Sequence, residues 1–318
     1  MKSGVLAVMV ALFAATLVAD EAVRRREYSG IAEIDGHLTI VDDQVNGQLI
    51  RLQATIDPSQ DVALVPVTET GRTSLKQNLA TDLESIGVLA DGRVVALSER
   101  LRCLIDQQGR VIQYPEIYNE IGNRGLEGLA IRAEGRNSQI AVCWEGGYLQ
   151  PNDVALELRN RLMGVALHPV VLMHKLSADA RPVEMKGVPA YTVRLDSPVE
   201  GYRFRMPDLE WIQMPSGDWG LIGLVSAENP RATKNRFRFH RLVLLKPDHS
   251  EKTLVSVGAP IELSELLGEL GNANWEGICW WNDHTIVLCY DSFPPGPPRI
   301  AVINLRKVRP DWLHSSAR

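Results

Sequence analysis

A hairpin pattern that occurs five times along this chain of 318 residues restricts its fold more than any other feature. Each copy begins with a Glu, or with a Ser in the first copy, and continues as a short apolar strand. A turn such as Asp35-Gly36 or Asp91-Gly92 follows, and these dipeptides favour the tight turns of β-hairpins. A second β-rich strand then ends on an acid. The five copies are residues 29–43, 84–99, 127–145, 210–228 and 276–291.

Further strand-like runs follow each hairpin, so most units hold four short strands. This pattern is typical of an all-β protein, a β-propeller built from four-stranded blades. Five blades are preferred, and the long interval between Glu127 and Glu210 leaves room for a sixth. The last unit shows only three strands, and we expect residues 21–28 to supply its fourth, which would close the ring and remove exposed sheet edges. The runs are residues 49–52, 63–67, 101–105, 110–114, 170–176, 191–195, 237–245, 253–257 and 299–305.

The N-terminus carries a pattern of its own. Lys2 precedes an uncharged apolar run, residues 4–19, which is short for a membrane span and fits the central region of a secretory signal. We therefore expect a signal peptide at 1–19, a single propeller domain at 20–318, and export to the periplasm or the medium. An uncleaved anchor is the alternative, because Arg24 to Arg26 lie just beyond the run. No second apolar stretch reaches spanning length.

The charge and the cysteines exclude some classes of protein. A net charge of −5 argues against nucleic-acid binding, which depends on neutralising phosphates. The spacing of Cys103, Cys143, Cys279 and Cys289 matches no metal motif. We expect Cys103 and Cys143 to be buried free thiols. Cys279 and Cys289 flank one predicted hairpin and could form a disulfide if its register allows.

The repeated Glu residues are the main candidates for a functional site. In a propeller, the innermost strand of each blade lines the central channel, so the Glu that begins each such strand should point toward one mouth of the ring. The acid that closes each hairpin should lie near the same end. The leading acids are Glu84, Glu127, Glu210 and Glu276, and the closing acids are Asp43, Glu99, Glu145, Glu228 and Asp291.

Crowded carboxylates repel one another and need protons, backbone N–H donors or a cation. A hard cation with oxygen ligands satisfies this need, and Ca²⁺ tolerates irregular cages best. Asn123 and Asn274 could add amide oxygens. A structural interpretation has equal weight: each Glu would bind backbone N–H groups of the next blade and hold the blades together. Gly128 and Gly277, each directly after a Glu, indicate close backbone packing near the axis.

The segments "NRGLEGLAI" at 123–131, "DLESIGVLADGRVVALSE" at 82–99 and "NWEGICWWNDHTIVLCYDS" at 274–292 resemble the exported phytase-like family, described as "esterase-like activity of phytase". The resemblance covers roughly residues 28–305. It implies an exported propeller that hydrolyses phosphate or carboxylic esters, with Glu127 and Glu276 at the positions of the family's Glu-Gly motif. Calcium-dependent lactonase propellers are similar at a greater distance. This chain departs from the pattern at Ser29 and at Trp211.

Other sequence motifs give weaker evidence for a functional site. The chain has no GxSxG, HExxH or phosphate-binding loop. The stretch "RFRFHR" at 236–241 alternates basic and aromatic residues. Arg238 and His240 could bind an anionic substrate there, and Arg124 is a further candidate for this role, although such alternation is more often a half-exposed outer strand.

Two functions follow from these patterns. One is a metal-assisted hydrolase, in which Glu84, Glu127 and Glu276 hold Ca²⁺ or activate water against a small-molecule ester or anionic ligand. The other is a non-catalytic binding propeller in which the repeated Glu residues are structural. We expect a monomer in both cases. The convergence of the acids in space distinguishes the two.

Overall fold

A computed structural model describes residues 27–42, 47–75, 81–118, 125–145, 168–179, 183–195, 202–229, 237–291 and 298–314. The expected signal peptide at 1–19 lies outside these ranges. Among the described residues, no helix is long and apolar enough to cross a membrane.

Strands dominate the described chain, and they form five antiparallel units. The first holds β1 (Tyr28–Ile34), β2 (His37–Asp42), β3 (Gln48–Gln53) and β5 (Thr68–Ser74); the second holds β6 (Leu83–Val88), β7 (Val94–Ser98), β8 (Cys103–Asp106) and β9 (Gly109–Gln113), with β13 (Val183–Glu184) at its edge. The third holds β10 (Leu126–Glu134), β11 (Asn137–Trp144), β12 (Val170–Ser177) and β14 (Ala190–Arg194). The fourth holds β15 (Arg203–Gln213), β16 (Trp219–Glu228), β17 (Phe237–Asp248) and β18 (Thr253–Ser256), with β19 (Ile261–Glu262) beside β17. The fifth holds β20 (Asn274–Asn282), β21 (Thr285–Asp291), β22 (Arg299–Asn304) and β4 (Val62–Pro66).

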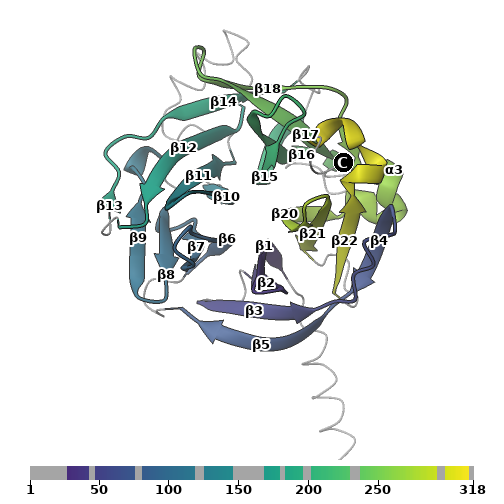
Figure 1. Ribbon diagram of the computed structural model, residues 1–318, viewed down its shortest axis with the longest axis horizontal. Coiled ribbons are helices and arrows are strands. Elements are labelled where there is room, and N and C mark those ends of the chain that lie inside the picture. Colours follow the sequence, from purple (N-terminus) through teal and green to yellow (C-terminus); the bar gives the residue numbers. More distant parts are fainter. Residues whose placement is uncertain are drawn as a thin grey trace, which may run out of the picture.

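These units surround a common axis, with their first strands innermost (Figure 1). The inner strands contact one another in the cyclic order β1, β6, β10, β15, β20 and back to β1. This arrangement confirms the all-β propeller fold. Residues 146–167, where a sixth blade was left open, lie outside the described residues, so the preference for five blades stays a prediction.

The ring closes through a segment that differs from the expected one. The run at 63–67 was assigned to the first unit, but β4 pairs antiparallel with β22 and forms the outer strand of the last unit. Strand β4 therefore takes the place expected for residues 21–28. Residues 21–26 lie outside the described residues, and Tyr28 belongs to β1. The chain leaves the first unit, contributes β4 to the last, and returns as β5 beside β3. N-terminal and C-terminal parts of the chain thus share one sheet, which covers an edge of β22.

The third and fourth units are joined at the rim. Strand β14 pairs parallel with β18, which merges the two units into one continuous sheet. The remaining elements are short helices: α3 (Leu263–Leu267), α4 (Leu305–Val308), η1 (Glu116–Tyr118), η2 (Gly268–Asn272) and η3 (Pro310–Trp312).

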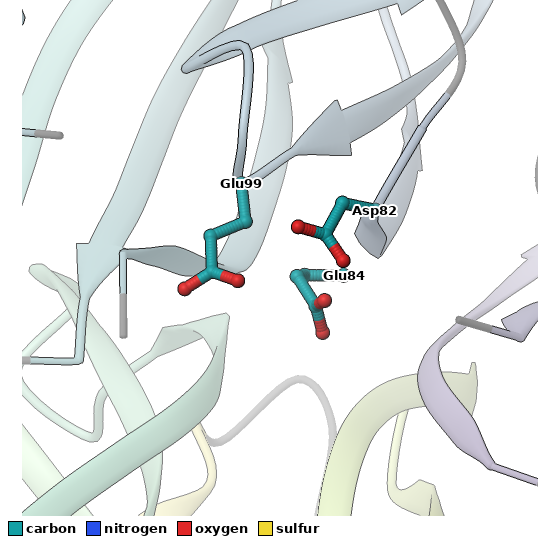
Figure 2. Close-up of side chains that lie close together, drawn as sticks. All are labelled: Asp82, Glu84 and Glu99. Atoms are coloured by element: carbon teal, nitrogen blue, oxygen red, sulfur yellow. The ribbon is translucent and has the colours of Figure 1, made fainter. Parts of the chain in front are cut away.

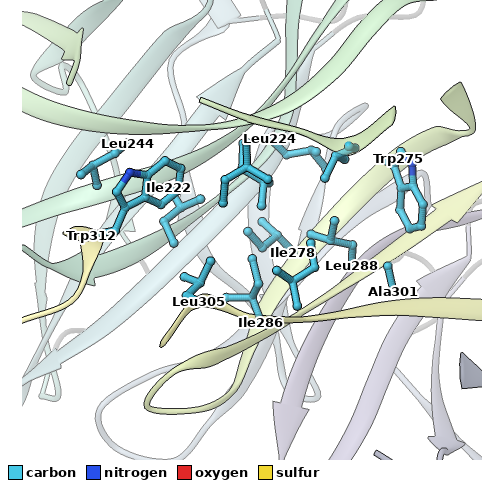
Figure 3. Packing of buried hydrophobic residues seen from close by; sticks show 14 of the residues in the cluster. Ile222, Leu224, Leu244, Trp275, Ile278, Ile286, Leu288, Ala301, Leu305 and Trp312 are labelled. Atoms are coloured by element: carbon cyan, nitrogen blue, oxygen red, sulfur yellow. The ribbon is translucent and has the colours of Figure 1, made fainter. Parts of the chain in front are cut away.

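Apolar side chains fill the space between neighbouring units. Between the fourth and fifth, Ile222 and Leu224 of β16 belong to the same buried cluster as Ile278 of β20 and Leu288 of β21 (Figure 3). Trp312 of η3 is 1% exposed and packs into the same cluster, so the C-terminal segment is part of the core. Alternate residues of a strand face opposite sides of its sheet. Apolar residues are buried on both sides here, because both faces of these sheets are covered.

All four cysteines are buried free thiols. The register explains why Cys279 and Cys289 do not pair: Cys279 lies opposite Val287, and Cys289 lies opposite Gly277. Burial raises the pKa of both thiols well above the usual value, so they stay protonated and unreactive.

Glycine lets the inner strands approach closely, as the sequence indicated. A Cβ atom on Gly128 would lie 2.7 Å from the Cα atom of Asp208, and one on Gly277 would lie 2.6 Å from Sγ of Cys289. No side chain fits at these distances without a shift of backbone or of packed core atoms.

We expect Gly128→Ala to lower the free energy of unfolding by about 2–3 kcal/mol, because its methyl group would push β10 away from β15. The matched control is Gly71→Ala in β5, where no atom lies within 4 Å of the added Cβ. It should change stability by less than about 0.5 kcal/mol. Urea denaturation of the two variants measures both values, and equal effects would contradict close packing at the axis.

Candidate functional site

A β-bulge at the start of three inner strands places three glutamates at one mouth of the channel. The register shifts between Leu83 and Ser85, between Leu126 and Gly128, and between Trp275 and Gly277. The bulged residues are Glu84, Glu127 and Glu276. A bulge re-aims a side chain out of the regular alternation. The same irregularity in β1 falls at Ser29, the departure noted in the sequence.

Their carboxylates interact with one another. Burial, followed by the charge of Glu127, holds the pKa of Glu84 well above the ordinary value, and Glu276 contributes in the same direction. The expected convergence therefore holds for Glu84, Glu127 and Glu276.

The acids that close the hairpins lie at the same end. Glu99, Glu145 and Glu228 are 3%, 1% and 0% exposed, so they are part of the buried structure rather than a solvated rim. Asp291 is half-buried and its charge reaches Glu276. Asp43 lies outside the described residues.

A buried arginine that no sequence motif marks occupies this group of acids. Arg205 of β15 donates from Nη1 and Nη2 to the two carboxylate oxygens of Glu276, at 3.0 and 2.9 Å. Its Nη2 lies 3.6 Å from Glu127, and its Nε contacts Glu145. Burial alone would lower the pKa of Arg205, but the charges of Glu276, Glu127 and Glu228 raise it above its usual value. One guanidinium therefore contacts three carboxylates on this side of the mouth and offsets one of their negative charges.

The alignment of the fourth unit was wrong, and this explains why Arg205 was missed. The unit was aligned on Glu210, yet β15 begins at Arg203 and its bulge falls between Arg205 and Asp208. Glu210 lies farther along the strand, opposite Ile222. It is not one of the acids at the mouth.

Asp208 binds backbone N–H groups of neighbouring units and holds them together, which is the structural role predicted as an alternative for the repeated Glu residues. Its Oδ1 accepts a hydrogen bond from the backbone N–H of Leu129 in β10, at 3.0 Å. Its Oδ2 accepts one from the backbone N–H of Ile278 in β20, at 2.9 Å. One carboxylate thus links three inner strands between the two ends of the channel. Burial raises its pKa well above the usual value, while these backbone donors oppose the shift.

At the start of the second unit, three carboxylates form a potential cation site. One oxygen each from Asp82, Glu84 and Glu99 lies within 4.8 Å of the others (Figure 2). Asp82 and Glu84 come from the start of β6, and Glu99 follows β7. Gly125 packs against Glu99, since a Cβ there would lie 2.5 Å from its Cγ. The donor set is all oxygen, which suits Ca²⁺ or Mg²⁺.

The other candidates are placed as follows. Asn274 contacts both Arg205, at 3.0 Å, and Glu276. It therefore belongs to the arginine network. Asn123 and Arg124 lie outside the described residues.

The basic–aromatic stretch separates into two environments. The register of β16 and β17 shifts between Phe237 and Phe239, which leaves Arg238 exposed at the bulge. His240 is fully buried. Burial, followed by the charge of Arg205, lowers its pKa to about 3, so it is neutral at physiological pH. The two residues therefore do not form one solvent-facing anion site, and an anion-binding role for Arg238 stays a prediction.

Sequence signals existed for only part of this site. Asp82 and Glu99 flank the second hairpin, and their pairing follows from strand ends meeting in an antiparallel ladder. Arg205 and Asp208 gave no such signal. The segment "RFRMPD" at 203–208 resembles a polar loop before a strand, and only the register of β15 shows that it belongs to the inner strand.

No family model matches the chain, and no curated protein matches it. The resemblance to the phytase-like family therefore stays a prediction. Among solved structures, a candidate glycoside hydrolase from Parabacteroides distasonis is 12% identical with a TM-score of 0.44, and the match covers 88% of this chain and 87% of that one. A protein of unknown function from Dyadobacter fermentans is 9% identical with a TM-score of 0.38, covering 87% and 93%. A candidate gluconolactonase is 8% identical with a TM-score of 0.36, covering 89% and 90%. These distant likenesses carry no argument about activity.

We expect Arg205→Ala to lower the free energy of unfolding by about 3–5 kcal/mol at neutral pH, because it leaves buried carboxylates without their countercharge. Without Arg205, the pKa values of Glu127, Glu145 and Glu276 should rise. Stability should then return as the pH falls through these raised values and the acids take up protons. Urea midpoints at pH 5 and pH 8 measure this. A loss that is equal at both pH values would contradict the electrostatic role.

Glu210 gives a second pH-dependent prediction. Burial raises its pKa to about 8, and the backbone N–H of Trp211 opposes the shift. The stabilisation from this raised pKa is complete below the ordinary value of 4.5 and is lost as the pH rises through about 8. Glu210→Gln should therefore be more stable than the unchanged protein by roughly 5 kcal/mol at pH 9, and nearly equal to it at pH 4. Glu265→Gln, on exposed α3, is the control, and a pH-independent difference for Glu210→Gln would contradict the assignment.

Proposed function

We propose that this protein is an exported β-propeller hydrolase that holds Ca²⁺ at Asp82, Glu84 and Glu99 and acts on phosphate or carboxylic esters. The observation that carries the proposal is the convergence of these three carboxylates within 4.8 Å at the channel mouth. Like charges this close favour a bound cation or a proton, and the exposed Arg100, 3.7 Å from Asp82, supplies one countercharge. Burial, followed by the charge of Glu127, raises the pKa of Glu84.

The residues present fit a calcium ion. Three carboxylates from one hairpin supply hard oxygen donors, and Ca²⁺ takes six to eight oxygen ligands, which leaves positions for water and for a substrate oxygen. When bound, the ion would polarise a phosphoryl or acyl oxygen and lower the pKa of a bound water.

The remaining acids take different roles. Glu127 interacts with both Glu84 and Arg205, and we assign it as the base that accepts a proton from water. Glu276 forms a two-pronged ion pair with Arg205, so its lone pairs are engaged and it acts as a positioning group for that guanidinium. Arg205 in turn keeps Glu127 ionised, as a general base must be.

A second function is favoured by the same arginine. Arg205 contacts Glu127, Glu145 and Glu276 and supplies a countercharge within the protein, which lowers the need for a metal in this part of the mouth. In a non-catalytic binding propeller, the acids would be wholly structural and the mouth would only hold a ligand. Export rests on the apolar run at 4–19 in both cases.

Calcium binding to the full chain is the deciding measurement. We expect calorimetry to show one site that is weakened about tenfold or more, roughly 1.4 kcal/mol, in the double variant Glu84→Gln, Glu99→Gln. Adding Ca²⁺ should also raise the unfolding temperature of the unchanged protein at pH 8 more than at pH 5, because protons compete for the carboxylates. Hydrolysis of p-nitrophenyl phosphate and p-nitrophenyl acetate should then require Ca²⁺ and disappear with a chelator.

The control is Glu116→Gln, Glu265→Gln, which removes two exposed acids and should bind Ca²⁺ normally. If the ion binds and neither ester is cleaved, the binding propeller is supported. If no ion binds to any form, the metal-assisted mechanism is excluded.

A further inference from the structure

The opposite end of the channel holds a pocket that the acidic mouth does not use. It has a volume of about 610 Å³, within the range of small-molecule sites. It is lined by the later halves of the inner strands, whereas the acids lie at their starts. Arg132 lies five residues beyond Glu127 along β10, which corresponds to about 16 Å of extended strand. Asp208 and the close glycine contacts fill the space between the two ends.

Four tryptophans gather around this pocket: Trp211, Trp219, Trp280 and Trp281. Two of them are fixed by hydrogen bonds to the inner strands. Nε1 of Trp280 donates to the carbonyl of Trp211 at 2.7 Å, and Nε1 of Trp211 donates to the carbonyl of Ala130 at 3.3 Å. Trp219 is 38% exposed, one of only two large apolar side chains so exposed in the described part of the chain. The half-buried ring of Trp280, held in this way, presents an apolar face that loses little entropy on binding, whereas Trp211, which is 8% exposed, mainly supports the wall.

Arg132 is built into the aromatic wall. Its guanidinium carbon lies 4.2 Å from the ring centre of Trp219 and 5.4 Å from that of Trp211. Its Nε is buried and has no hydrogen-bond partner among the described residues. A positive group within the wall disfavours an ammonium ligand, because the tryptophan faces already stabilise one cation.

Carboxyl and amide groups complete the lining of the pocket. Glu33, Glu210 and Asp283 offer carboxyl oxygens, and Gln213 offers an amide. Burial raises the pKa of Glu210 to about 8, so near neutral pH this carboxyl can donate as well as accept. The acids on the rim disfavour a phosphate or another strongly anionic ligand.

We propose that this pocket binds a neutral saccharide. The C–H face of a pyranose ring is apolar and stacks on indole rings, while its hydroxyl groups both donate and accept hydrogen bonds. The pocket offers fixed indole faces beside acceptors and donors in the same small space, and this combination matches a sugar better than a cation, an anion or a wholly apolar molecule. The inference does not depend on hydrolysis or on calcium at the acidic mouth.

Tryptophan fluorescence and calorimetry on the full chain test the proposal with cellotetraose and maltotetraose as probes. Choline and glucuronate are the charged comparisons. We expect at least one neutral oligosaccharide to bind and to change the fluorescence, and Trp219→Ala to weaken it about tenfold or more. Val255→Ala removes an equally exposed apolar side chain and should bind normally. The variant Glu84→Gln, Glu99→Gln should also bind the sugar normally, which separates this pocket from the acidic mouth.

Several outcomes would overturn the proposal. Binding of choline or glucuronate without binding of a neutral sugar would show a charged ligand instead. No response to either oligosaccharide up to about 10 mM, where a site with a Kd of 1 mM is about nine-tenths full, would show that the pocket is not a saccharide site. An unchanged affinity in Trp219→Ala would place the sugar elsewhere. If Trp219→Ala lowers the unfolding temperature, Gln213→Ala replaces it and should weaken binding in the same direction.

Discussion

The burial of Arg205 among carboxylates is the interaction on which the channel mouth depends. Bulges at the starts of β6, β10 and β20 bring Glu84, Glu127 and Glu276 to one place, and burial makes their repulsion costly. A guanidinium presents several donors in a fixed plane, so a single side chain can contact Glu127, Glu145 and Glu276 together. The protein thus supplies its own cation on one side of the mouth. The carboxylates of Asp82, Glu84 and Glu99 form a second group, in which Asp82 also lies 3.7 Å from Arg100.

A second constraint acts halfway along the axis. Inner strands that meet around one point bring backbone N–H groups together without strand partners, and buried donors must be satisfied. Asp208 accepts from Leu129 and Ile278, while glycines at 128 and 277 leave the room this requires. The channel is therefore divided. One end gathers carboxylates, and the other gathers indole rings.

This division gives the two ends independent chemistry. Charge repulsion governs the acidic mouth, so its state depends on pH, salt and metal ions. Fixed indole rings govern the aromatic pocket, and Arg132 and Glu210 adjust its polarity. Both sites can exist in one propeller because each inner strand runs from one end of the channel to the other. Residues at the start and at the end of a strand therefore belong to different sites.

The sequence by itself determined the class of fold and the direction of the acids. Hairpin turns such as Asp91-Gly92, repeated strands and Glu-Gly pairs are local signals, and Glu84, Glu127 and Glu276 lie together as they predicted. The tertiary structure alone decided the closing strand, because β4 pairs with β22 across almost the whole chain. It also decided the role of the fourth unit. Register in β15 is set by packing against β16, and a shift of a few residues exchanges Glu210 for Arg205 at the mouth. The aromatic pocket likewise combines residues from four inner strands, and no local pattern shows which side chains will share one end of an axis.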